Sequence, residues 1–202
     1  MALWKTKINA SDRAAKRAIF LDRDGVVIAE RHYLSDPEQV KILPGVVEAM
    51  IRAHDAGFLL VGVSNQSGIG RGRFSVSDFE SVMTRLDELL EQGGISFDAF
   101  LYCPHAPEEN CKCRKPQPGL LQEASCHVNY SPNGSWVVGD KLCDVNLGRN
   151  LGLGGILVLT GHGLNQADDV AKTWPDDPMV KIVADLPAAI DFILNNDRGQ
   201  ML

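Results

Sequence analysis

The chain predicts an α/β fold, a Rossmann-like three-layer sandwich around a mainly parallel sheet. Short apolar runs alternate along it with amphipathic segments, which is typical of βαβ units. Its 202 residues fit one domain, and a hydrophobic content of 45% is enough for a full core. The sequence contains no internal repeat, low-complexity tract or linker. We therefore expect an N-terminal tail over residues 1–17, followed by a single domain over residues 18–202.

The strands are predicted from short apolar runs bounded by turn residues. Five runs qualify, at residues 18–21, 58–63, 99–102, 136–138 and 156–159, and residues 182–184 offer a sixth strand at the edge. The helices are predicted from apolar side chains at helical spacing. The first follows Pro44 and ends at Gly57, and the second begins near Ser77, which with Glu80 forms a possible capping box. Further helices are expected over residues 119–127, 144–151 and 186–194.

The overall charge narrows the range of partners. A net charge of −6 disfavours a nucleic acid or an anionic membrane, although it allows a local basic pocket for a phosphorylated substrate. No run approaches the roughly 20 apolar residues of a membrane span, and residues 1–17 lack the apolar stretch of a signal peptide. We expect a cytoplasmic monomer that acts on a small molecule and contacts neither nucleic acid nor membrane.

Two carboxylates follow the first predicted strand and precede a glycine. Asp22 and Asp24 therefore lie at the carboxyl end of a parallel strand, where α/β folds bind ligands. Carboxylates this close repel, which raises the pKa of at least one of them unless a cation neutralises the pair. The pair indicates a bound metal or a shared proton. The alternative is a polar turn whose acids cap the next segment.

Three more polar segments lie at predicted strand ends or helix starts. The second strand ends at Ser64–Gly68, whose hydroxyl, amides and glycine can form an anion-binding nest, or an ordinary polar turn. The fourth strand is followed by Asp140 and Asp144, the latter also a candidate helix cap. Arg114 and Lys115 lie between the second and the fourth predicted strands and are followed by a proline that stiffens the segment. Adjacent cations of this kind suit a phosphoryl group, although paired surface cations are common.

Cysteines cluster in one segment instead of being spread as a disulfide framework. Three thiols and an imidazole lie within eleven residues, at Cys103, His105, Cys111 and Cys113. This set matches structural Zn²⁺ in a scaffolding role, with free thiols as the alternative because the spacing departs from the common zinc knuckle. The remaining two, Cys126 and Cys143, are expected to be buried thiols.

The ordered set of acids, hydroxyl and cations resembles the haloacid dehalogenase superfamily of phosphohydrolases. Its four motifs match Asp22-x-Asp24-Gly25, Ser64, Lys115 and Gly139-Asp140 with Asp144. The resemblance implies that Asp22 is the nucleophile, that Asp24 is first the general acid and then the general base, and that Ser64 and Lys115 orient the phosphoryl oxygens. It also implies Mg²⁺ held by Asp22, the backbone carbonyl of Asp24 and Asp140, while Asp144 fixes Lys115 or a metal-bound water.

Within that superfamily, residues from about 18 to 163 look like the D-glycero-D-manno-heptose 1,7-bisphosphate 7-phosphatase family. The resemblance includes the segment at residues 103–113, the cysteine loop, which is expected to bind zinc and which many related phosphatases lack. It implies removal of the 7-phosphate in the synthesis of nucleotide-activated heptose for bacterial lipopolysaccharide or surface-layer glycans, without a large cap domain. The substrate contacts carried over by position are Glu30, Arg31, His32, Tyr33, Ser64, Asn65, Gln66, Ser67, Arg114, Lys115 and Lys141.

The chain departs from the family pattern at two places. Glu30–Tyr33 stands where the family often has an Asp-x-Gly-Tyr turn, and Ser64 stands where threonine is common. Serine keeps the hydroxyl, whereas the altered turn lines the sugar side of the pocket. A remote phosphate would be gripped by Arg71, Arg73 or Arg114.

Three rival functions remain open. Histidinol-phosphate phosphatase is the nearest, because a related subfamily carries a similar cysteine loop and the same acids. A polynucleotide 3′-phosphatase shares the motifs but is expected to carry a basic stripe, which this acidic chain lacks. The third is a zinc-stabilised binding module without catalysis, which the full set of catalytic side chains disfavours.

Overall fold

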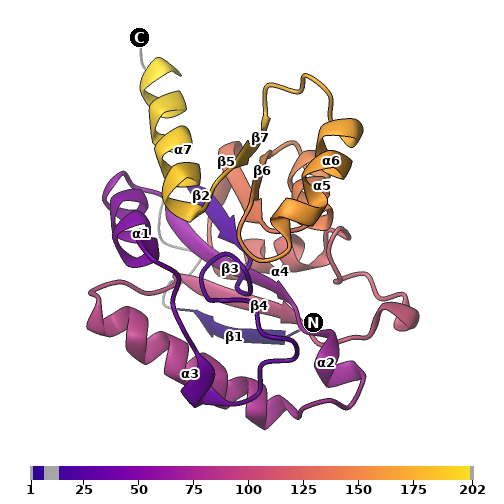
Figure 1. The fold of residues 1–202 in the computed structure, drawn as a ribbon. Helices are drawn as coiled ribbons and strands as arrows, with labels where there is room; N and C mark the ends of the chain where they lie inside the picture. Colours follow the sequence, from indigo (N-terminus) through magenta and orange to yellow (C-terminus); the bar gives the residue numbers. More distant parts are fainter. Residues whose placement is uncertain (1, 7–13, 201–202) are drawn as a thin grey trace.

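The computed structural model describes residues 2–6 and 14–200, and it has the predicted α/β architecture (Figure 1). A seven-stranded sheet has the order β1-β4-β3-β2-β5-β6-β7. Only β1 runs antiparallel to its neighbour, and the other adjacent pairs are parallel. The strands are β1 (Ala2–Thr6), β2 (Lys16–Leu21), β3 (Leu59–Asn65), β4 (Ala99–Cys103), β5 (Tyr130–Gly139), β6 (Gly154–Val158) and β7 (Val180–Val183).

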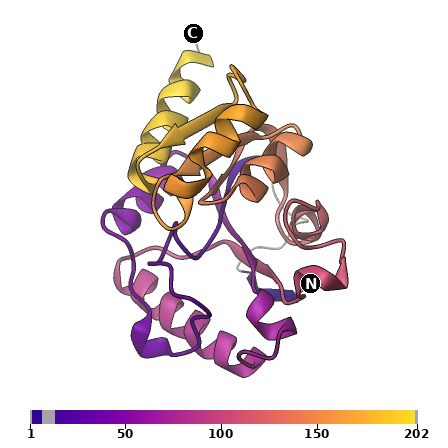
Figure 2. The ribbon, with the colours of Figure 1, turned by 45° about the vertical axis from the view of Figure 1, so that its right-hand side comes forward.

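Helices cover both faces of this sheet, which gives the three layers seen in Figures 1 and 2. Helices α1, α3 and α7 pack on one face, and α4 and α5 on the other. The α-helices are α1 (Val46–Asp55), α2 (Ser67–Gly70), α3 (Val76–Gln92), α4 (Gly119–His127), α5 (Leu142–Asn150), α6 (Gly163–Thr173) and α7 (Leu186–Gln200), and 3₁₀ turns lie at Pro37–Gln39 and Pro107–Glu109. None of these helices is long and apolar enough to span a membrane.

The central strand β2 divides the core between the two layers. Alternate side chains of a strand point to opposite faces, so Ile19 and Leu21 join the cluster under α1, α3 and α7, while Ala18 and Phe20 join the cluster under α4 and α5. All of these side chains are fully buried. A strand buried on both sides holds its carboxyl end rigidly, and the segment that begins at Asp22 starts from that end.

The parallel strands bring the chemistry-bearing segments to one edge of the sheet. Leu21 pairs in register with Val138 of β5, and Asn65, the last residue of β3, pairs with Cys103, the last residue of β4. The segments that follow β2, β3, β4 and β5 therefore start close together. In the described part of the chain no additional cap domain covers this edge (Figure 2).

The N-terminal segment differs from the expected tail. Ala2–Thr6 forms strand β1, which pairs antiparallel with β4 and closes one edge of the sheet, and β2 begins at Lys16. The Trp4 ring packs edge-on against Phe79 of α3 at 6.4 Å between centroids, and Lys5 forms an ion pair with Asp87 at 2.7 Å. The expectation of a tail was wrong for these five residues, while residues 1 and 7–13 lie outside the described part.

Three smaller expectations also need correction. The cap of α3 is Ser75 with Asp78, not Ser77 with Glu80, because the Ser75 hydroxyl accepts from the Asp78 N–H and the Asp78 carboxylate accepts from the Ser75 N–H. Helix α6 was not expected at all. Cys126 is exposed instead of buried, because it faces solvent near the end of α4.

The contact of β1 with the core gives a test of its role. Trp4→Ala removes an aromatic ring packed against Phe79, and we expect it to lower the free energy of unfolding by about 1–3 kcal/mol. Leu3→Ala is the matched control, because Leu3 is exposed and its loss should cost less than about 0.5 kcal/mol. Chemical denaturation measures both. A Trp4→Ala variant as stable as wild type would mean that the contact with Phe79 adds nothing to the fold.

Candidate active site

Asp22 is the first residue after β2 and is almost fully buried. Its Oδ1 accepts a hydrogen bond from the Arg23 backbone N–H at 2.8 Å, and its Oδ2 lies 3.1 Å from the Lys115 ammonium. Burial alone would raise the pKa of Asp22. The charges of Lys115 and Lys141 and the Arg23 N–H outweigh burial and hold that pKa below its ordinary value. Asp22 is therefore an ionised carboxylate at the bottom of the site.

Lys115 links two of the acids. Its buried Nζ lies 2.6 Å from Asp144 Oδ1 as well as 3.1 Å from Asp22, and it donates to the Val63 carbonyl at 2.8 Å. Burial lowers the pKa of Lys115, but the two carboxylates raise it well above its ordinary value. Burial raises the pKa of Asp144 to about 6, because the Lys115 charge only partly offsets it. Lys115 thus stays charged beside Asp22, and Asp144 fixes its position.

Asp24 is held by two neighbours. The buried Arg23 guanidinium donates to its carboxylate from Nε at 3.1 Å and from Nη2 at 2.8 and 3.0 Å. The Gln66 amide donates to Asp24 Oδ2 and to the Ser64 hydroxyl, both at 2.9 Å. The Arg23 guanidinium also lies over the Phe79 ring, 5.4 Å from its centroid. No role was expected for Arg23 from the sequence, because an arginine between two acids also fits an exposed turn.

Asp140 presents an oxygen that suits a cation. It is fully buried, and its Oδ2 accepts from the His162 backbone N–H at 2.8 Å. Its Oδ1 makes no hydrogen bond within the described part of the chain, although the Lys141 ammonium lies 3.4 Å away. Oxygens of Asp22, Asp140 and Asp144 all lie within 4.8 Å of one another. Carboxylate oxygens in this arrangement fit Mg²⁺, which binds through one or two carboxylates and keeps several waters.

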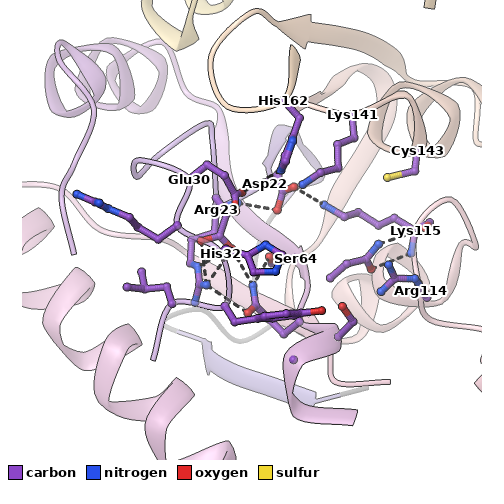
Figure 3. A pocket seen from close by; sticks show the side chains of 18 of the residues that line it. Asp22, Arg23, Glu30, His32, Ser64, Arg114, Lys115, Lys141, Cys143 and His162 are labelled. Carbon is purple, nitrogen blue, oxygen red and sulfur yellow. Dashed lines mark hydrogen bonds and ion pairs between the residues drawn. The ribbon is translucent and has the colours of Figure 1, made fainter. Parts of the chain in front are cut away.

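A cavity of about 380 Å³ opens above these groups (Figure 3). Every substrate contact expected from the sequence lines it, and so do Asp22 and Asp24, the two acids expected to carry out catalysis. Burial, and next the charge of Asp24, raise the pKa of Glu30 to about 7. The lining also includes residues that the sequence analysis did not assign to the pocket: Arg23, Leu34, Gly68, Phe74, Cys143 and His162.

Two of the cations considered for a remote phosphate do not line the cavity. Arg71 forms an ion pair with Glu108 at 2.9 Å, and Arg73 lies over the Tyr33 ring at 5.9 Å from its centroid. Arg114 does line it, and its buried Nη1 makes no hydrogen bond to any residue that the structure describes. Of the three cations, Arg114 is thus the one placed to meet a ligand in the cavity.

Asn65 forms hydrogen bonds to the Lys115 backbone through both polar atoms of its side-chain amide. Its Oδ1 accepts from the Lys115 backbone N–H at 3.0 Å, and its Nδ2 donates to the Lys115 carbonyl at 3.2 Å. The Asn65 side chain thus pairs with the Lys115 backbone as a neighbouring strand would, and it joins β3 to the segment after the cysteine loop. Its polar atoms position Lys115, a role that the sequence analysis did not foresee for an expected substrate contact.

The three cysteines and the histidine of the loop come together as expected. Sulfur atoms of Cys103, Cys111 and Cys113 lie 3.4–3.5 Å apart, and His105 Nδ1 lies 3.3 Å from Cys113 and 3.6 Å from Cys103. Tetrahedral zinc with thiolates at about 2.3 Å needs sulfurs separated by about 3.8 Å. Burial raises the pKa of Cys111, but backbone N–H groups of the loop outweigh it and lower that pKa, which favours a thiolate. The donors therefore fit a structural zinc ion.

The cysteine loop is joined to the site by its backbone. The Gln66 N–H donates to the Cys103 carbonyl at 2.7 Å, and the Gly70 N–H donates to the Pro104 carbonyl at 2.8 Å. Cys113 leads directly into Arg114 and Lys115. The loop thus fixes the segment after β3, where an anion is expected to bind, and it leads into Lys115, which faces Asp22.

Together, this fold and this constellation of acids and lysine define a haloacid dehalogenase-like hydrolase. A HAD-hydrolase-like family model matches residues 112–189, and a polynucleotide kinase 3 phosphatase model matches residues 17–146. A Yersinia pestis D-glycero-beta-D-manno-heptose-1,7-bisphosphate 7-phosphatase is 37% identical over 182 residues, covering 86% of this chain and 94% of the relative. The chain belongs to the D-glycero-D-manno-heptose 1,7-bisphosphate 7-phosphatase family.

Further relatives support this family membership. The Escherichia coli K12 enzyme of the same name is 36% identical, covering 86% of this chain and 93% of the relative. The crystal structure of D,D-heptose 1,7-bisphosphate phosphatase from B. bronchiseptica, complexed with magnesium and phosphate, matches with a TM-score of 0.79 and 30% identity over 89% of this chain and 99% of that one. The Burkholderia thailandensis phosphatase of that name gives 0.66 and 28%, with the same coverage of each chain.

The geometry of the cysteine loop predicts the effect of losing a ligand. Cys113→Ser should reduce the zinc content from about one ion per chain and lower the melting temperature by at least ~5 °C, because structural zinc contributes directly to folding free energy. Cys126→Ser, which changes an exposed thiol outside the cluster, should alter neither. Elemental analysis and calorimetry give the two readouts. Zinc-free protein that melts at the wild-type temperature would contradict a scaffolding role.

Proposed function

We propose that the chain removes the 7-phosphate of D-glycero-D-manno-heptose 1,7-bisphosphate through an aspartyl-phosphate intermediate. The observation that carries this proposal is the Asp22 carboxylate, paired with Lys115 at the base of a cavity, with Asp24 two residues along the chain. The family relationship supplies the substrate. The product would feed the synthesis of nucleotide-activated heptose for lipopolysaccharide.

In the first step an Asp22 oxygen attacks the phosphorus of the 7-phosphate. The bond from phosphorus to the sugar oxygen breaks, and the departing oxygen takes a proton from the Asp24 carboxyl group. In the second step the ionised Asp24 takes a proton from water, whose oxygen attacks the same phosphorus. Inorganic phosphate leaves and the Asp22 carboxylate is regenerated. General acid–base catalysis of this kind is typically worth about 10²–10⁴-fold.

Lys115 and Ser64 provide the electrostatic support for both steps. The Lys115 ammonium is fixed by Asp144 and Val63, so it needs little rearrangement as negative charge shifts among the phosphoryl oxygens. Mg²⁺, held by Asp22, the Asp24 carbonyl and Asp140, would neutralise the repulsion between the phosphate dianion and the carboxylate nucleophile. The Ser64 hydroxyl, which accepts from Gln66, keeps its own proton to donate to a phosphoryl oxygen.

The other end of the cavity fits a sugar with a second phosphate. Glu30–Tyr33 supplies carboxylate, guanidinium, imidazole and phenol groups beside the site. Arg114 faces the same cavity with a free N–H. A remote phosphate bound by Arg114 would hold the reacting end in line, so its binding energy should appear partly in turnover.

Substitutions of Asp22 and Asp24 are expected to reduce turnover for different reasons. Asp22→Asn should abolish turnover, because an amide has no anionic oxygen to attack phosphorus. Asp24→Asn should lose proton transfer and about 10²–10⁴-fold in kcat, while still binding Mg²⁺ through its backbone carbonyl. Asp191→Asn, a surface change in an ion pair with Arg52, should stay within about twofold of wild type. Phosphate release measures all three, and an Asp24→Asn rate within about twofold of wild type would remove that residue from its role.

Substrate choice tests the proposal against its nearest rival. Heptose 1,7-bisphosphate should exceed both a heptose monophosphate and histidinol phosphate in kcat/KM by at least ~10-fold, since one charge-assisted contact is worth about 1.5–3 kcal/mol. Arg114→Ala should remove most of that advantage, whereas Arg71→Ala, outside the cavity, should keep it. Better turnover of histidinol phosphate would overturn the proposed substrate in favour of histidinol-phosphate phosphatase.

A further inference from the structure

We propose that the turn at residues 160–162, between β6 and α6, makes the cation site selective for Mg²⁺ over Ca²⁺. It does so by leaving only one oxygen of Asp140 free. The inference rests on the proposed function in one respect, namely that a divalent cation binds at Asp22 and Asp140. The turn itself carries no acid or thiol, and the sequence analysis gave it no role.

The turn encloses Asp140 Oδ2. The His162 backbone N–H donates to this oxygen at 2.8 Å. A Cβ atom at Gly161 would lie 2.3 Å from Oδ2, and one at Gly25 would lie 2.4 Å from it, so the oxygen fits only because both positions lack a side chain. The Thr160 hydroxyl donates to the Gly25 carbonyl at 2.5 Å and ties the two glycine segments together.

The other oxygen of Asp140 is left open. Oδ1 is buried and makes no hydrogen bond with the described residues, and Asp140 belongs to the cluster of acids that includes Asp22. The Lys141 ammonium lies 3.4 Å from it, on a side chain that is 38% exposed and can turn away towards solvent. Asp140 can therefore offer a cation Oδ1 but not both oxygens.

One free oxygen favours the smaller ion. Mg²⁺ takes six ligands at about 2.0–2.1 Å in near-octahedral geometry, with single carboxylate oxygens and waters. Ca²⁺ takes six to eight at about 2.3–2.6 Å and often uses both oxygens of one carboxylate. A carboxylate whose second oxygen is engaged by a backbone N–H and closed in by two glycines denies Ca²⁺ that mode of binding. The turn is thus a positioning element for a metal ligand.

Two glycine substitutions with the same backbone strain test this inference. Gly161 and Gly152 both have positive φ, +57° and +74°, so alanine is strained at either position, but a Cβ at Gly152 meets no atom within 4 Å. Titration calorimetry with MgCl₂ and with CaCl₂ would use the zinc-replete full chain, freed of magnesium by dialysis. We expect Gly161→Ala to weaken Mg²⁺ binding at least ~10-fold and to reduce the ratio of Mg²⁺ to Ca²⁺ affinity. Gly152→Ala should leave both affinities within about twofold of wild type.

A second variant keeps the test valid if Gly161→Ala does not fold. Thr160→Val keeps the branched shape but removes the hydrogen bond to Gly25, and it too should reduce the affinity ratio. An unchanged ratio in the folded variants, equal effects at Gly161 and Gly152, or a wild type that binds Ca²⁺ as tightly as Mg²⁺ would each overturn the inference. A wild type that binds no Mg²⁺ would instead contradict the magnesium site of the proposed function.

Discussion

The buried ion pairs of Lys115 are the interaction on which the site depends. Without this ammonium, Asp22 and Asp144 would be two carboxylates side by side in the protein interior, a costly arrangement unless one of them takes up a proton. With it, Asp22 stays ionised and Asp144 stays fixed. The Val63 carbonyl adds a third partner, so the cation is anchored to the sheet itself. The charge of Asp22 thus depends on where the chain places Lys115.

The position of Lys115 is set by segments that lie beyond the ends of the strands. Lys115 follows the cysteine loop, and the Asn65 amide holds its backbone from the end of β3. The loop and β3 therefore fix the same lysine from two sides. The cysteine loop gives a rigid start to the segment around Lys115, which forms no strand or helix in the described structure. A zinc ion held by the three cysteines and the histidine would contribute mechanically, because this donor set leaves no open position for substrate.

Much of the fold and of the site could be predicted because the information was local. Short apolar runs indicated the central strands, and polar residues at the ends of those strands indicated Asp22, Ser64 and Asp140, since parallel strands share an edge. The missed parts depend on contacts between distant segments. Strand β1 is held by its contacts with β4 and α3. The turn before α6 contacts Asp140 through the His162 backbone N–H and through the space left at Gly161, and neither contact can be recognised from the residue types alone. Arg23 was missed because its burial comes from Phe79 and Gln66, over forty residues away in the chain.

Gly139 makes room for Asp144 in the same way that Gly25 and Gly161 make room for Asp140. A Cβ at this position would lie 2.2 Å from the Asp144 carboxylate, so both acids of this segment occupy volume that neighbouring side chains would otherwise fill. The acids and these glycines are therefore one steric unit drawn from separate parts of the chain. A side chain at any one of these glycines would therefore displace the carboxylate that it meets. Moving one of these acids to suit a different ligand would require changes at two or more positions together, including positions whose residues carry no functional group.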